Sequence, residues 1–92
     1  GEPTHPIFIS GPHPEYPAKA RADKNMLNGI VVVSFTVDHN GIPANVAVDK
    51  SLRPDFDQSA IQAVKQYRFK PALLHGHPVE YPLTIDVDFQ MF

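Results

Sequence analysis

The stretch that decides the fold is residues 29–48, which read GIVVVSFTVDHNGIPANVAV. β-Branched and aromatic residues dominate Ile30–Val37, which is typical of a strand. Because side chains alternate between the faces of a strand, one face carries Val31, Val33, Phe35 and Val37. The segment Asp38–Gly41 has turn chemistry, since Asn40-Gly41 is a strong hairpin signal. A second strand over Ile42–Val48 completes a predicted antiparallel hairpin.

A helix is expected on each side of this hairpin. Pro17 suits a first helical turn, alanines and charged residues follow it, and Asn28-Gly29 can end that helix. After the hairpin, Asp55 or Asp57 can cap a second helix. Its apolar stripe at helical spacing consists of Phe56, Ala60, Ala63, Val64 and Tyr67. This helix is predicted to end before Pro71.

The last part of the chain predicts a loop over residues 73–78, which contains Gly76, and then one more strand. Tyr81, Leu83, Ile85, Val87 and Phe89 alternate there with polar residues or proline. The predicted order is therefore helix, strand, strand, helix, strand. This is an α+β fold, in which a three-stranded antiparallel sheet packs against two helices.

The last strand is expected to pair with the first and to lie at an edge of the sheet, because a helix must cross between them. Pro82, Asp86 and Asp88 are residues of the kind that prevent indiscriminate pairing of an exposed edge. An exposed edge is also a docking site, because an extended peptide can join it as a further strand. The two aspartates could act as edge guards or as partner contacts, and the sequence leaves both roles open.

Composition limits the function classes. The 92 residues suffice for one small domain, and eight basic against ten acidic residues give a net charge of −2. That balance argues against binding nucleic acid through phosphate neutralisation. The chain lacks cysteine, a signal-peptide pattern and an apolar run near the ~20 residues of a membrane-spanning helix.

The N-terminal region is rich in proline, since five of the ten prolines fall within the first seventeen residues. We therefore expect residues 1–15 to be the end of a linker or an arm, and residues 16–92 to be the folded domain. The chain begins Gly1-Glu2 rather than with methionine, so we expect it to be a piece of a longer protein.

Residues that invite a catalytic or metal interpretation have simpler explanations. His75-Gly76-His77 offers two metal ligands in a loop without a third nearby. Asp55 and Asp57 precede a predicted helix, where acids stabilise the helix dipole. Ser34 and Ser51 have no histidine and carboxylate arrangement beside them in the sequence. We expect no catalytic residue, no metal, no cofactor and no enzymatic activity.

Four ordered motifs between Pro14 and Phe89 resemble one known family. They are Tyr16-Pro17-Ala18-Lys19-Ala20, the strand and turn of residues 29–41, Phe56–Ile61 continuing to Tyr67-Arg68-Phe69-Lys70-Pro71, and the alternating strand after Gly76. Together they are similar to the C-terminal domain of the energy-transducing protein TonB. The sequence departs from the family pattern at Tyr67, where tryptophan is commoner, and at Pro82.

The resemblance implies a periplasmic binding domain that is tethered to the inner membrane. TonB proteins associate with the ExbB–ExbD complex through an N-terminal anchor absent from this chain, and they cross the periplasm on a proline-rich linker. Their C-terminal domain grips the TonB box of outer-membrane transporters by strand addition. It then transmits force derived from the proton-motive force for import of siderophore-bound iron, cobalamin or similar substrates.

The resemblance also implies a set of partner-binding residues. These are the last strand, Leu83, Thr84, Ile85, Asp86, Val87, Asp88 and Phe89, and the segment before the first helix, His13, Pro14, Glu15, Tyr16 and Pro17. Lys19 matches a basic position that can face acidic residues of the transporter plug. An exposed edge could also pair with its own copy in a strand-exchanged homodimer. The alternative interpretation is a TonB-like peptide-binding or scaffold domain of another envelope protein, such as a sensor or a TolA-like protein.

Overall fold

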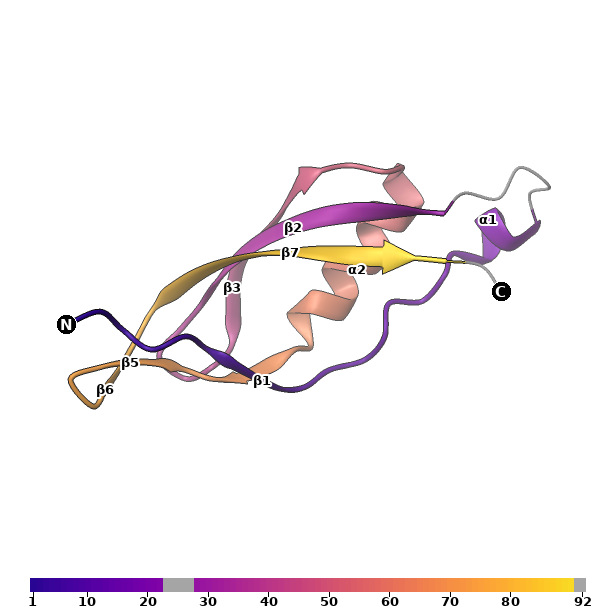
Figure 1. Ribbon diagram of the computed structural model, residues 1–92. Helices are drawn as coiled ribbons and strands as arrows, with labels where there is room; N and C mark the ends of the chain where they lie inside the picture. The colour runs from indigo at the N-terminus through magenta and orange to yellow at the C-terminus, as the bar shows by residue number, and fades with distance from the viewer. Residues whose placement is uncertain (23–27, 91–92) are drawn as a thin grey trace.

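The computed structural model describes residues 1–22 and 28–90 of the chain, which form an elongated molecule of 52 × 21 × 19 Å. Its helices and strands follow each other in the order β1 (Ile7–Ser10), α1 (Ala18–Ala22), β2 (Gly29–Val37), β3 (Pro43–Lys50), α2 (Pro54–Lys65), β4 (Arg68–Lys70), β5 (Ala72–Leu74), β6 (His77–Val79) and β7 (Tyr81–Phe89) (Figure 1).

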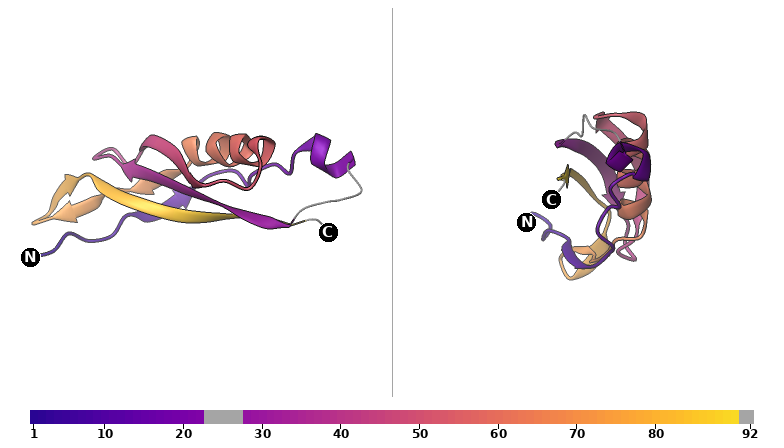
Figure 2. Two further views of the ribbon diagram at one scale, coloured as in Figure 1. Left: turned by 90° about the horizontal axis from the view of Figure 1, so that it is seen from above. Right: turned by 90° about the vertical axis from the view of Figure 1, so that its right-hand side faces the viewer.

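The centre of the fold is an antiparallel sheet in the order β3-β2-β7. The β2–β7 ladder is unbroken from Gly29 opposite Phe89 to Val37 opposite Tyr81. Helix α2 covers one face of this sheet (Figure 2). The predicted α+β class and the position of the last strand beside the first, at an edge, are confirmed.

The core lies between α2 and the sheet. The face of β2 that the alternation predicts is buried, and the same core contains Phe56, Ala60 and Val64 of α2. Three aromatic rings join the N-terminal segment to β7: the Tyr16 and Phe56 ring centroids are 5.1 Å apart, and so are those of Phe56 and Phe89. Both contacts are edge-to-face, which is a preferred geometry for aromatic pairs. The end of β7 is thereby fixed to the residues that precede α1.

The β2–β3 turn also attaches the hairpin to β4. Asp38 Oδ1 accepts hydrogen bonds from the backbone N–H groups of Asn40 and Ile42, both at 2.9 Å. The bond from Ile42 is the main cause that lowers the pKa of the Asp38 carboxyl. Gly41 has a φ of 81°, and its carbonyl accepts a bond of 2.9 Å from the N–H of Phe69. A Cβ at Gly41 would lie 1.9 Å from the Phe69 carbonyl oxygen, so the turn requires glycine.

The predicted loop over residues 73–78 is wrong. Strands β5 and β6 form a two-stranded antiparallel hairpin there, with Leu74 opposite His77. The turn residues His75 and Gly76 have φ values of 52° and 80°, and two positive values in a row are typical of a tight hairpin turn. Three-residue strands are too short to produce a clear alternation, which is why the sequence pattern did not reveal them.

The proline-rich N-terminal segment is extended, and part of it lies against the domain. Strand β1 pairs antiparallel with β4, with Phe8 opposite Phe69. The Phe8 ring also makes edge-to-face contacts with Tyr67 and Phe69, at centroid distances of 5.1 and 5.7 Å. The division of the chain after residue 15 stays a prediction.

The first predicted helix is present as α1, which begins one residue after Pro17. Residues 23–27 of that prediction lie outside the described residues. Ala20 of α1 is buried in the core.

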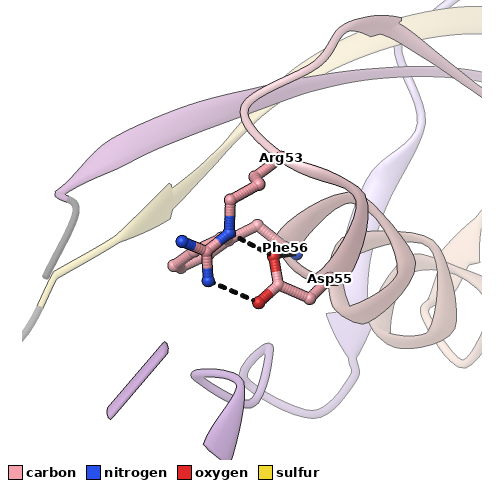
Figure 3. Close-up of polar contacts among 3 residues, drawn as sticks. All are labelled: Arg53, Asp55 and Phe56. Carbon is pink, nitrogen blue, oxygen red and sulfur yellow. Dashed lines mark hydrogen bonds and ion pairs between the residues drawn. The ribbon is translucent and has the colours of Figure 1, made fainter. Parts of the chain in front are cut away.

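The start of α2 corrects the expectation that an aspartate caps this helix. Arg53 occupies the N-cap, and Asp55 and Asp57 lie in the first turn. Asp55 accepts bonds of 2.9 and 2.7 Å from Nε and Nη2 of Arg53 and one of 3.0 Å from the N–H of Phe56 (Figure 3). Asp57 accepts bonds from the N–H of Leu52 and the hydroxyl of Ser51. Both acids therefore stabilise the entry to the helix.

Stability in acid should depend on Asp55. The Arg53 guanidinium lowers the pKa of the Asp55 carboxyl from 3.8 to about 2. Because the folded-state pKa is below the unfolded value, this carboxylate stabilises the fold above pH ~4, and the contribution is lost as the pH falls through 2. In urea unfolding at pH 2 to 5, Asp55→Asn should lose less stability on acidification than the wild type. Equal losses in both proteins would contradict this role.

Candidate functional site

The candidate site is the outer edge of β7. This strand has β2 on one side and is the last strand of its sheet among the described residues. Figure 1 shows β7 beside β2, and Figure 2 shows both strands on one side of α2. A strand at the edge of a sheet presents backbone N–H and C=O groups that the sheet does not pair.

Pro82 determines which backbone groups of β7 point outward. In an antiparallel ladder, opposing residues alternate between pairs that exchange hydrogen bonds and pairs that do not. Pro82 lies opposite Thr36 within the unbroken ladder. Since proline has no N–H, this pair does not exchange hydrogen bonds. The hydrogen-bonded residues of β7 are therefore the odd-numbered ones, and the backbone groups of Thr84, Asp86 and Asp88 point away from β2.

The side chains of β7 also alternate, between the face of the sheet that packs on the core and the exposed face. Val87 and Phe89 are buried and Leu83 and Ile85 are half-buried, all on the side that packs against the core. Thr84, Asp86 and Asp88 are exposed. Their neighbours across the ladder in β2 are Ser34, Val32 and Ile30, respectively.

The structure brings two of the five predicted residues before α1 to the end of this edge. Pro14 and Tyr16 line a hollow of about 230 Å³ together with Asp88, Phe89 and Gln90. The Tyr16 side chain is buried and contacts Phe56. Sequence reasoning missed Gln90, whose Nε2 donates a bond of 3.1 Å to Asp88 Oδ2. Gln90 directly follows β7, and nothing in its place in the sequence indicated that it belongs to the site.

His13, Glu15 and Pro17 face a different space. They line a cavity of about 400 Å³ between their own segment and α2, whose other walls include Asp55, Gln58 and Gln62. The Ser59 hydroxyl donates to the Glu15 carbonyl and ties the segment to α2. Lys19 is exposed on α1. The five predicted partner-binding residues before α1 thus line two different spaces, one beside the end of β7 and one beside α2.

The histidines that could have suggested a metal site are not gathered with further ligands in the described part of the chain. His75 and His77 lie in the exposed β5–β6 hairpin. Within residues 1–22 and 28–90, no three histidine, cysteine, aspartate or glutamate side chains gather closely enough to hold a metal ion. Neither helix in that part of the chain is long and apolar enough to cross a membrane.

The structure is thus a small α+β domain in which β7 is an edge strand of the three-stranded sheet in the described part of the chain. Comparison with known proteins agrees with that description. A sequence model of the family described as the C-terminal of Gram-negative bacterial TonB protein matches residues 12–91. The chain belongs to the TonB C-terminal domain family.

Similar proteins carry the same family name. The chain is 30% identical over 99 residues to Protein TonB of Vibrio cholerae, an alignment that covers 99% of this chain and 40% of that protein. It is 32% identical over 85 residues to Protein tonB2 of Pseudomonas aeruginosa, which covers 91% of this chain and 31% of that protein. Protein TonB of Xanthomonas campestris is 32% identical over 80 residues, which cover 85% of this chain and 34% of that protein. The chain thus spans well under half the length of these relatives.

The direction of the β7 backbone can be tested with proline substitutions. Thr84→Pro removes an outward N–H and should cost less than about 1 kcal/mol of unfolding free energy, because prolines are tolerated on the open side of an edge strand. Ile85→Pro removes an N–H that bonds to β2 and leaves its acceptor unpaired, so it should cost more, about 1–3 kcal/mol. Chemical denaturation measures both values. A larger loss from Thr84→Pro than from Ile85→Pro would contradict the derived direction.

Proposed function

We propose that this chain is the periplasmic partner-binding domain of a TonB-type energy transducer. It grips the TonB box of outer-membrane transporters by adding the box as a strand to the open edge of β7. Force derived from the proton-motive force then passes through the domain to the transporter, for uptake of siderophore-bound iron, cobalamin or similar substrates. The observation that supports this function is the outer edge of β7, which no other described strand covers, in a domain of the TonB family.

The energetics of the edge suit a partner that is bound and released. At roughly 3.3 Å per residue, Leu83–Phe89 offers an edge about 23 Å long. Pro82 removes one outward donor, so the usable N–H groups are those of Thr84, Asp86 and Asp88, together with the outward carbonyls. At about 0.5–1.5 kcal/mol for each hydrogen bond, and after the cost of ordering the peptide, the expected affinity is about micromolar.

Backbone pairing also suits a transducer that serves several transporters. The ladder hydrogen bonds are formed by main-chain groups, which all peptides share. An anchor that associates with ExbB–ExbD lies, in this proposal, outside the 92 residues. The domain itself acts as a binding module.

A titration of the domain with a synthetic TonB-box peptide tests the proposal. Amide resonances of residues 83–89, and those of Glu15 and Tyr16 beside Pro14, should shift on binding. Thr84→Pro should weaken binding by about fivefold or more, because an outward donor is lost, whereas Thr84→Ala, which keeps that donor, should change it little. Shifts away from β7 would overturn the proposed site. An absence of binding at millimolar peptide would favour a TonB-like scaffold instead.

Lys19 is proposed to contact acidic residues of the transporter plug. It is exposed on α1, outside the residues that line the hollow at the end of β7. Lys19→Glu should therefore weaken binding to a whole transporter more than binding to the isolated box peptide. Arg21→Glu, a matched charge reversal on the same helix, serves as the control. Identical losses for the transporter and the peptide would contradict a plug contact by Lys19.

A further inference from the structure

The N-terminal segment runs along the domain from the start of β7 to its end. At the start of β7, His5 Nδ1 and the Tyr81 hydroxyl share a hydrogen bond of 2.8 Å, and the two rings meet edge to face. At the other end, Pro14 lines the hollow that contains Asp88 and Phe89. Figures 1 and 2 show the N-terminus beside the β5–β6 hairpin and α1 at the opposite end of the molecule.

The backbone of Leu73 holds the beginning of this segment. Leu73 lies opposite Pro78 in the β5–β6 ladder. Since proline has no N–H, this pair does not exchange hydrogen bonds, and both backbone groups of Leu73 point away from β6. Its carbonyl accepts a bond from the N–H of Thr4, and its own N–H donates to the Thr4 hydroxyl, both at 2.8 Å. The outward groups of Leu73 are thus satisfied by the N-terminal segment.

A close contact with Tyr67 fixes the segment again after β1. A Cβ at Gly11 would lie 2.2 Å from Tyr67 Cδ1, so the tyrosine ring packs directly on the backbone of Gly11. The same ring receives the edge-to-face contact of Phe8. Residues 4–11, which make the contacts with β4, β5, Tyr67 and Tyr81, are called the N-terminal strap below.

The strap is attached at the surface, whereas the next attachment of the chain lies in the core. Ile7, Phe8 and Ile9 are each more than half exposed, and the short β1–β4 pairing is irregular. Tyr16, in contrast, is buried in the core against Phe56. Segments with few buried contacts open at a lower free energy than the core. The strap should therefore detach before the core opens, with Tyr16 still in place.

We propose that the strap is a releasable link that determines where tension enters the domain. This inference rests on the proposed function, in which force arrives through the chain that precedes the domain. With the strap attached, tension from the N-terminal side enters beside Tyr81, at the start of β7. After the strap detaches, tension enters at Tyr16, which packs through Phe56 on Phe89 at the end of β7. Release lengthens the tether without unfolding the domain, because residues 4–15 span about 40 Å when extended.

Amide hydrogen exchange at Leu73 in the 92-residue chain tests the attachment, because this N–H bonds to Thr4 and not to β6. Phe8→Ala removes the aromatic contacts of the strap, and Gly11→Ala places a Cβ against the Tyr67 ring. Each variant should speed exchange at Leu73 about tenfold or more. The β2 amides of Val31 and Val33, which bond to β7, should keep their exchange rates within about twofold.

Each of these variants has a matched control in the same segment. Ile9→Ala removes a neighbouring side chain that is 59% exposed. Gly1→Ala adds a Cβ that meets no atom of the described residues within 4 Å. Both controls should leave exchange at Leu73 unchanged.

Pulling on single molecules measures the release itself. The chain has no cysteine, so a Thr84→Cys variant offers one attachment point on the exposed face of β7, and the N-terminus offers the other. A first step of about 40 Å, reversible on relaxation, should precede unfolding of the domain. Gly11→Ala should move this step to lower force, and Gly1→Ala should not.

Unchanged exchange at Leu73 in both Phe8→Ala and Gly11→Ala, or unfolding of the domain without a shorter first step, would overturn the proposed strap. A first step that Gly11→Ala leaves at the same force would assign the step to another segment and would also overturn it. Neither measurement uses a box peptide, so these failures leave the proposed strand addition intact. A peptide titration without shifts on β7 would contradict strand addition and would not alter the exchange result at Leu73.

Discussion

The structure depends on the unbroken antiparallel ladder between β2 and β7. It holds the C-terminal strand beside the most buried strand of the domain over nine consecutive residue pairs. Because Pro82 lies within it, the ladder has only one possible hydrogen-bonding alternation. That alternation turns the core-facing residues of β7 toward α2, and no strand within residues 1–22 and 28–90 pairs with the outer backbone groups of β7. The fold and the candidate site are therefore two consequences of one pairing.

The aromatic contacts give the edge a defined end. Tyr16 packs on Phe56 and Phe56 on Phe89, so the segment before α1 is attached to the last residues of β7 through the core. The hollow at this end exists because of that packing, and it combines apolar walls with the carboxylate of Asp88. A docked strand would thus meet an open backbone ladder that ends in a shaped, acidic hollow. Backbone pairing would supply affinity for many partners, because main-chain groups are common to all peptides.

Much of this arrangement could be predicted from the sequence. The alternation in Ile30–Val37 and Tyr81–Phe89 predicted two strands and their buried faces, and Asn40-Gly41 predicted the hairpin turn. Strand β4 was missed because Arg68–Lys70 directly follows α2, so its three residues were interpreted as the end of that helix. Strand β1 could not be predicted because its partner lies about sixty residues away and the prolines on either side of it, Pro6 and Pro12, indicate a linker. The site needed both kinds of information, since the acids on β7 were visible in the sequence but the direction of their backbone groups depends on the register.

Amide hydrogen exchange along β7, measured with and without a strand peptide, tests the central claim most directly. In the free domain, the amides of Leu83, Ile85 and Val87 should be protected, and those of Thr84, Asp86 and Asp88 should exchange fast. Bound peptide should protect the second set and change the first set little. Protection of Thr84, Asp86 and Asp88 in the free domain, or fast exchange of the odd-numbered amides, would contradict the derived ladder and the edge that depends on it.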